Sequence, residues 1–186
     1  TFADPLSSAT DEEPNACLYS KSDLVISGGG TLTVNANYQN GVTGKDTLTI
    51  ENTKIAVNAV NHGINGKDSL TITNATVDVV SGGDALRSTN DSDATLGYVT
   101  VTDSTLTLNA GEDGIQAETN LTLSGSTLNV TTGGGSSASL SDDTSAKGLK
   151  AGTALTVESG IFDLNCADDA IHSNGTVTIL DGTFEI

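Results

Sequence analysis

Gly41-Val42-Thr43-Gly44-Lys45-Asp46-Thr47-Leu48-Thr49-Ile50 is followed by Gly63-Ile64-Asn65-Gly66-Lys67-Asp68-Ser69-Leu70-Thr71-Ile72, so one pattern returns after 63 − 41 = 22 residues. Later copies diverge, but each keeps a small residue before an aliphatic one, and then an aliphatic-Thr-aliphatic triplet. Self-similarity with a period of about 20–50 residues is typical of solenoids and propellers. Two steps of the repeat are longer than the others, by 16 − 9 = 7 residues between Asp84 and Thr100 and by 25 − 13 = 12 residues between Thr122 and Lys147. The chain is therefore predicted to be a regular coil with two insertions.

Aliphatic residues recur at three places in each repeat, and they alternate with polar residues. This spacing of two predicts short strands with one buried face, and we find no apolar stripe with a helical period. One predicted inward column is Leu48, Leu70, Val99, Leu121, Leu155 and Val177. Three strands in each coil, stacked on their counterparts in the next coil, predict an all-β chain folded as a parallel β-helix (solenoid) of about seven 22-residue coils. The crossover rule favours the right-handed form.

Composition and charge restrict the class of protein further. The chain has 21 Gly, 3% aromatic residues and a net charge of −17, which argues against nucleic acid or an anionic membrane as a partner. No apolar run is long enough to span a membrane, so we expect no membrane insertion, and we expect a monomer. Because a compact fold of this charge repels itself, we also expect cations to neutralise part of it.

The repeat predicts one domain. We expect the parallel β-helix to cover residues 16–186, and residues 1–15 to form an extension that is poorly structured or acts as a cap. No initiating Met or signal peptide opens the sequence, so we expect a processed or trimmed chain that continues beyond Ile186. The predicted register separates Cys17 from Cys166 by about five turns, or roughly 24 Å, which is too far for a disulfide.

Charged residues gather next to the small residue of each repeat. The residue before it forms an outward column: Asn40, His62, Asp84, Asp113, Lys147 and Asp169. Because this column repeats once per coil, the Cα atoms of Asp84 and Asp113 are predicted to lie about 5 Å apart with Glu112 beside them, and carboxylates that close need a proton or a metal. Carboxylates, backbone carbonyls and water form the all-oxygen shell that calcium prefers.

The insertions and the last coil add further acids, which we expect on the same side of the solenoid. The candidate calcium ligands are Asp84, Asp91, Asp93, Glu112, Asp113, Asp142, Asp143, Asp168 and Asp169. The alternative is a solvated acidic edge in which Lys147 bridges Asp113 and Asp169 as a salt ladder.

The repeat x-Gly-Ile-x-Gly-Lys-Asp-x-Leu-Thr-Ile and the corners Gly82-Gly83-Asp84-Ala85-Leu86 and Glu112-Asp113-Gly114-Ile115 resemble a family of bacterial cell-surface β-helical carbohydrate-binding domains, which are similar in fold to pectate lyases. The resemblance covers residues 16–186. It implies an extracellular or cell-surface location, affinity for cellulose and acidic pectin-like sugars, and bound calcium with Asp84, Glu112, Asp113, Asp168 and Asp169 as ligands. Lys147 stands where the family has Asp.

Three functions follow from these residues. The favoured one is a calcium-dependent carbohydrate-binding module for plant cell-wall polysaccharides, cellulose and polygalacturonate, in which the two insertions wall a groove and a carboxylated sugar is held by Arg87, Lys147, Lys150 and His172. The first alternative is a pectate-lyase-like enzyme that cleaves uronate polymers by β-elimination, with Lys147 as the base, or Lys150 or Arg87 in its place. The second alternative is a structural or adhesin solenoid that calcium rigidifies.

Overall fold

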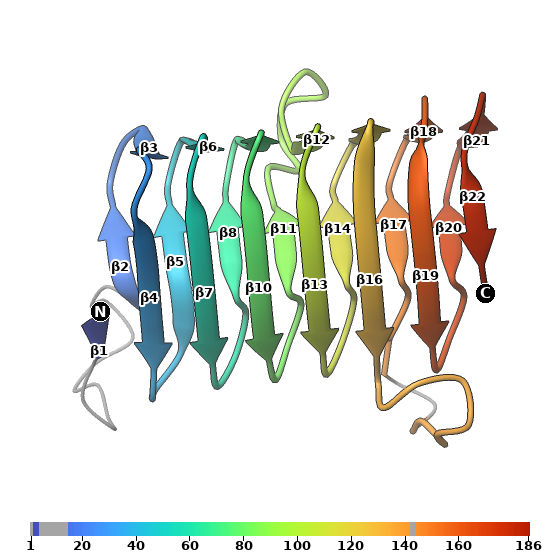
Figure 1. The fold of residues 1–186 in the computed structure, drawn as a ribbon, viewed down its shortest axis with the longest axis horizontal. Coiled ribbons are helices and arrows are strands. Elements are labelled where there is room, and N and C mark those ends of the chain that lie inside the picture. Colours follow the sequence, from blue (N-terminus) through green and yellow to red (C-terminus); the bar gives the residue numbers. More distant parts are fainter. Residues whose placement is uncertain (1, 4–14, 142–143) are drawn as a thin grey trace.

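Figure 1 shows the computed structural model, which describes residues 2–3, 15–141 and 144–186. The described residues form strands, turns and loops. They contain no helix, and hence none that could cross a membrane. The expectation of an all-β chain is confirmed.

Three parallel sheets run along the molecule, and each coil adds one strand to each sheet in turn. Sheet B opens each coil with β2 (Ala16–Ser20), β5 (Asn40–Gly44), β8 (Ile64–Gly66), β11 (Leu86–Ser88), β14 (Ile115–Ala117), β17 (Leu149–Ala151) and β20 (Ile171–Ser173). Sheet C follows with β3 (Leu24–Ser27), β6 (Thr47–Glu51), β9 (Ser69–Thr73), β12 (Tyr98–Thr102), β15 (Asn120–Ser124), β18 (Ala154–Val157) and β21 (Thr176–Ile179). Sheet A closes each coil with β4 (Thr31–Ala36), β7 (Lys54–Ala59), β10 (Thr76–Ser81), β13 (Thr105–Ala110), β16 (Ser126–Thr132), β19 (Gly160–Cys166) and β22 (Thr183–Glu185), and β1 (Phe2–Ala3) precedes them beside β4. The fold is thus the predicted parallel β-helix of about seven coils.

The strands pair in the register that the sequence predicts. Leu48 lies beside Leu70, Leu70 beside Val99, and Leu121 beside Leu155, and all are fully buried. Such columns share one core along the solenoid, because a single coil could not bury its own apolar side chains. In the last two coils the buried Phe162 stacks on the partly buried Phe184, and their ring centroids lie 4.7 Å apart.

The corner between sheets C and A turns through left-handed backbone. Asn52, Asn74 and Asp103 have φ angles of 52°, 48° and 48°, and Gly125 has 59°. Asn and Asp tolerate this conformation better than other residues with a side chain, which explains their place in the repeat. The Asn74 amide also donates a 2.8 Å hydrogen bond to Asn52, so successive corners are joined.

The two insertions leave the solenoid at different corners. Residues 89–97 follow β11 at the corner between sheets B and C, and residues 133–148 follow β16 at the corner between sheets A and B, so Figure 1 shows these loops on opposite sides. The expectation that both insertions border one edge is therefore wrong for the first. Asp142 and Asp143 lie outside the described residues.

The cysteines lie far apart in the stack. Cys17 is on β2 in the first coil and Cys166 is on β19 in the sixth, and no disulfide joins them. Burial raises the pKa of the Cys166 thiol above its usual value, although a hydrogen bond with the Thr132 side chain opposes this shift. The thiol therefore behaves as a small core residue.

Candidate functional site

Most of the charged residues that the sequence singles out gather at the corner where sheet A ends and sheet B begins. We call this group the charged corner; it consists of His62, Asp84, Arg87, Glu112, Asp113, Ser145, Lys147, Lys150, Asp168, Asp169 and His172. The corner recurs once per coil, so its side chains form a line along the solenoid axis.

A ladder of hydrogen bonds joins successive corners. The backbone N–H of each corner residue donates to the side chain of the corner residue one coil earlier: His62 to Asn40 Oδ1 at 3.2 Å, Asp84 to His62 Nδ1 at 2.9 Å, Asp113 to Asp84 Oδ1 at 3.1 Å, and Lys147 to Asp113 Oδ1 at 2.8 Å. Lys147 has no acceptor atom, and the N–H of Asp169 donates instead to Asp168 Oδ1. The corner column thus selects Asn, His and Asp, which carry an acceptor atom at the δ position, because the backbone N–H groups need one.

Asp84 is a buried carboxylate surrounded by donors. Its side chain is 4% exposed, and its Oδ2 lies 3.2 Å from Arg87 Nη1 and 3.3 Å from His62 Nδ1. Burial opposes ionisation, but the adjacent His62 ring, the charge of Arg87 and the N–H of Asp113 outweigh it and hold the pKa of Asp84 below its usual value. Asp84 is therefore an ionised acceptor at neutral pH.

Asp113 has a different set of partners. Its side chain is 2% exposed and accepts bonds from Ser145 Oγ at 2.7 Å and from Lys150 Nζ at 2.7 Å, besides the N–H of Lys147. Ser145 comes from the second insertion, and Lys150 from β17 in the following coil. The insertion therefore completes the shell of a carboxylate that belongs to the coil before it.

Lys147 contacts the acids of the last coil. Its ammonium pairs with Asp168 and lies 3.4 Å from Asp169, while His172 Nδ1 lies 2.9 Å from Asp169. The salt ladder from Asp113 through Lys147 to Asp169 is therefore wrong, because Lys150 reaches Asp113 in its place. Partial burial opposes the charge of Lys147, but Asp168 and Asp169 outweigh it and raise the pKa of Lys147. A lysine held in its charged form is unsuited to act as the base of a lyase.

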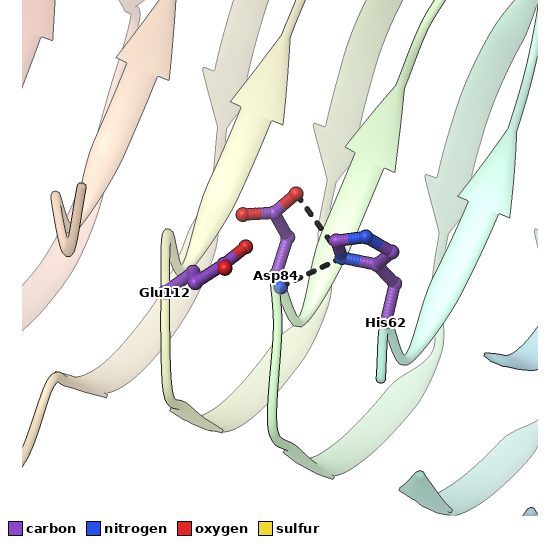
Figure 2. Close-up of side chains that lie close together, drawn as sticks. All are labelled: His62, Asp84 and Glu112. Atoms are coloured by element: carbon purple, nitrogen blue, oxygen red, sulfur yellow. Dashed lines mark hydrogen bonds and ion pairs between the residues drawn. The ribbon is translucent and has the colours of Figure 1, made fainter. Parts of the chain in front are cut away.

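The predicted calcium ligands fall into separate groups. Asp91 and Asp93 lie in the insertion at the other corner of the coil, where the Thr95 hydroxyl and N–H bond to Asp93 and lower its pKa. They cannot share an ion with Asp84 or Asp113. Figure 2 shows the three side chains that do converge: His62, Asp84 and Glu112, on three successive coils, with ligand atoms within 4.8 Å of one another.

This convergence does not fit a resident calcium ion. Arg87 Nη1 already lies 3.2 Å from Asp84 Oδ2 and 2.8 Å from His62 Nε2, so a guanidinium already supplies a positive charge beside two of the three side chains. One member of the trio offers nitrogen rather than oxygen, and calcium prefers oxygen ligands. Glu112 alone is exposed.

Three of the predicted sugar-binding residues share one row. Arg87, Gln116, Lys150 and His172 are paired in register across β11, β14, β17 and β20, and so stand side by side on the outer face of sheet B. The side chains of Arg87, Lys150 and His172 are 24%, 27% and 32% exposed, and Lys147 stands at the adjoining corner, with 15% exposed. We call Arg87, Gln116, Lys150 and His172 the sheet B row.

Sequence reasoning missed two parts of this site. It placed His62 in the corner column without recognising its ring as an acceptor for the next coil, although the run Asn40, His62, Asp84, Asp113 carries that signal. It could not find Ser145, because an insertion has no register with the other coils.

The fold defines a protein of the parallel β-helix class. A solved structure described as the polysaccharide lyase-like protein from C. thermocellum, gadolinium derivative, superimposes with a TM-score of 0.68 and 26% identity over 93% of this chain and 57% of that one. The family model of carbohydrate-binding domain-containing proteins matches residues 1–186, and the chain belongs to that family. A relative of the same description from Acetivibrio thermocellus is 47% identical over 58 residues, which are 31% of this chain and 19% of the relative. The chain thus spans only part of the length of both relatives.

Proposed function

We propose that this chain binds plant cell-wall polysaccharides, and that an acidic, pectin-like polygalacturonate lies along the sheet B row. The observation that carries the proposal is the row itself. The chain has a net charge of −17 and only 7 + 2 = 9 basic side chains, counting Lys, Arg and His. Four of these nine belong to the row and the adjoining Lys147. Each of these four side chains pairs with an Asp of the charged corner, and a uronate carboxylate is the same kind of partner, so the row favours an acidic polymer.

The geometry suits an extended polymer. Coils of a β-helix are about 4.8 Å apart, so a chain that runs parallel to the solenoid axis meets a new side chain at each coil. Arg87, whose side chain is 24% exposed, offers a planar guanidinium, and Lys150 offers a compact charge. A small cavity of about 70 Å³ beside the row is lined by Gln116, Glu118, Lys150 and Asn174 among others, and amide and charged groups of this kind can hold sugar hydroxyls.

Calcium enters this proposal as a bridge to the ligand. Glu112 is exposed and the Asp169 side chain is 54% exposed, and both stand next to the row. They would repel a uronate polymer unless a cation lies between the carboxylates, and calcium prefers such oxygen ligands. The similar solved protein is a gadolinium derivative, and gadolinium also prefers oxygen ligands.

A second observation favours sheet C as the face for cellulose, the neutral part of the proposal. Its seven strands contain a single Asp, Glu, Lys or Arg residue, Glu51, and their central outward column is threonine from Thr49 to Thr178. An uncharged flat face is compatible with a neutral polymer. We further propose an extracellular or cell-surface location, where such polymers occur.

The test uses Gln116, the uncharged member of the sheet B row. We expect Gln116→Lys to increase retention on insoluble polygalacturonate and Gln116→Glu to decrease it, each several-fold, because the variants change the charge without breaking an ion pair. Retention should fall when a chelator removes calcium. Pull-down with purified protein measures both effects, and absorbance of unsaturated uronide in the supernatant reports any lyase activity.

The matched control is Asn129, which is exposed on β16 of the same coil but belongs to sheet A. Asn129→Lys and Asn129→Glu change the net charge equally, and we expect them to leave retention near the level of the unmodified chain. Equal effects at both positions would show that net charge alone governs binding and would overturn the assignment to sheet B. Unsaturated product would make the chain a lyase.

A further inference from the structure

We infer that Arg87 and Lys150 supply the positive charge that the resemblance assigns to calcium, so the buried carboxylates of the charged corner are held by the protein's own cations. The inference concerns the ions that the fold needs and does not depend on the proposed function. It makes the β-helix stable without calcium, in contrast to the expectation drawn from its sequence.

The surroundings of Asp84 support this inference first. Both of its oxygens have donors: Oδ1 accepts from the N–H of Asp113, and Oδ2 lies 3.2 Å from Arg87 Nη1. The same Nη1 lies 2.8 Å from His62 Nε2, so one guanidinium nitrogen contacts two members of the convergent trio. A metal bound between His62, Asp84 and Glu112 would have to displace this charge.

Asp113 repeats the arrangement with other residues. The residue three positions after Asp84 is Arg87, but the residue three positions after Asp113 is the uncharged Gln116. Lys150 of the next coil fills the gap, and its Nζ lies 2.7 Å from Asp113 Oδ2. Since Ser145 and the N–H of Lys147 donate to Oδ1, each oxygen of this carboxylate too already has a donor.

The charges of the two sites lead to the same conclusion. Carboxylates that are 4% and 2% exposed must be paired or coordinate a metal. Each is paired here with a side-chain cation that another residue of the chain supplies. If the cation is removed, the carboxylate is left buried with an open coordination position, which is the condition under which calcium should bind.

The experiment measures Tm with about 5 mM calcium and with a chelator, for the unmodified chain, Arg87→Gln and Lys150→Gln. For the unmodified chain we expect the same Tm in both conditions. Each variant should lose about 5 °C in chelator, and calcium should restore most of that loss. Isothermal titration calorimetry with calcium alone should show a site in the variants and none in the unmodified chain over the same range.

Two further variants keep the outcome decisive. Arg87→Lys preserves the charge and should remain insensitive to calcium, and Lys54→Gln removes an exposed lysine of β7 that makes no ion pair within the described residues. A fall in the Tm of the unmodified chain on chelation would overturn the inference, as would variants whose lower Tm does not respond to calcium. Because no glycan is present, these outcomes are independent of polysaccharide retention.

Discussion

Asp113 and Asp169 occupy the same corner column two coils apart, yet their environments differ. The Asp113 side chain is 2% exposed and accepts three hydrogen bonds. The donors belong to the next coil and to the second insertion, which leads into that coil. The Asp169 side chain is 54% exposed and contacts only Lys147 and His172 within the described part of the chain. Within the described residues, Asp169 lacks the buried donors that surround Asp113. Residues of the following coil therefore make Asp113 a buried structural group, a role that its residue type alone does not give it.

The largest effect is expected at Asp113. Asp113→Ala removes the acceptor of a backbone N–H and leaves Ser145 and Lys150 without their partner, so we expect a loss of about 3–5 kcal/mol in the free energy of unfolding. Urea unfolding followed by circular dichroism measures the change. A loss below about 1 kcal/mol would equate Asp113 with a surface acid and remove the distinction between the two corners.

Asp84→Asn should have a smaller effect that depends on pH. The amide can still accept from the N–H of Asp113, but the charge opposite Arg87 is lost, and we expect a loss of about 2 kcal/mol at pH 7. The fold lowers the pKa of Asp84 below the ordinary value of 3.8. Between the lowered value and 3.8 the unfolded chain therefore binds more protons than the folded chain, and the stabilisation by the carboxylate is present above pH 3.8. It disappears as the pH falls through the lowered value.

The measurement is urea unfolding of both proteins from pH 7 down to about pH 2. We expect the difference in stability between the unmodified chain and Asp84→Asn to be constant down to about pH 4 and then to shrink. A difference that persists at the lowest pH would mean that the variant disturbs packing, and that the charge of Asp84 is not what stabilises the corner.

The contrast between core and corner also separates what the sequence can predict. The inward columns follow from the sequence, because alternation within strands and a constant step between coils place Leu48 next to Leu70 and Leu121 next to Leu155. The corner column follows in the same way, and Asp84, Asp113 and Asp169 take the predicted register. The prediction that the column faces outward is wrong for Asp84 and Asp113, which are buried by their donors. Vertical stacking is a property of the backbone, and the repeat encodes it directly.

The partners of these acids are diagonal contacts and depend on the reach of side chains. Lys150 leaves its strand three residues after the corner and extends back to Asp113 in the preceding coil, whereas Arg87 folds onto Asp84 in its own coil. A repeat does not distinguish these two directions. The prediction that Asp91 and Asp93 lie on the same side as Asp84 was wrong for another reason. The length of an insertion can be read from the sequence, but the corner at which it leaves the solenoid is known only when strands are assigned to sheets.

Asp169→Asn should have the smallest effect, and it sharpens the comparison because it changes the same residue type in the same column. Exposed ion pairs such as that between Lys147 and Asp169 contribute about 0–1 kcal/mol, and salt screens them. We expect a loss below about 0.5 kcal/mol at low salt that vanishes in about 1 M salt, whereas the loss in Asp113→Ala should persist because its bonds are buried. Parallel urea titrations at the two salt concentrations measure both. If the two variants respond to salt alike, burial is not the property that separates these corners, and the coil that follows Asp113 would no longer explain its role.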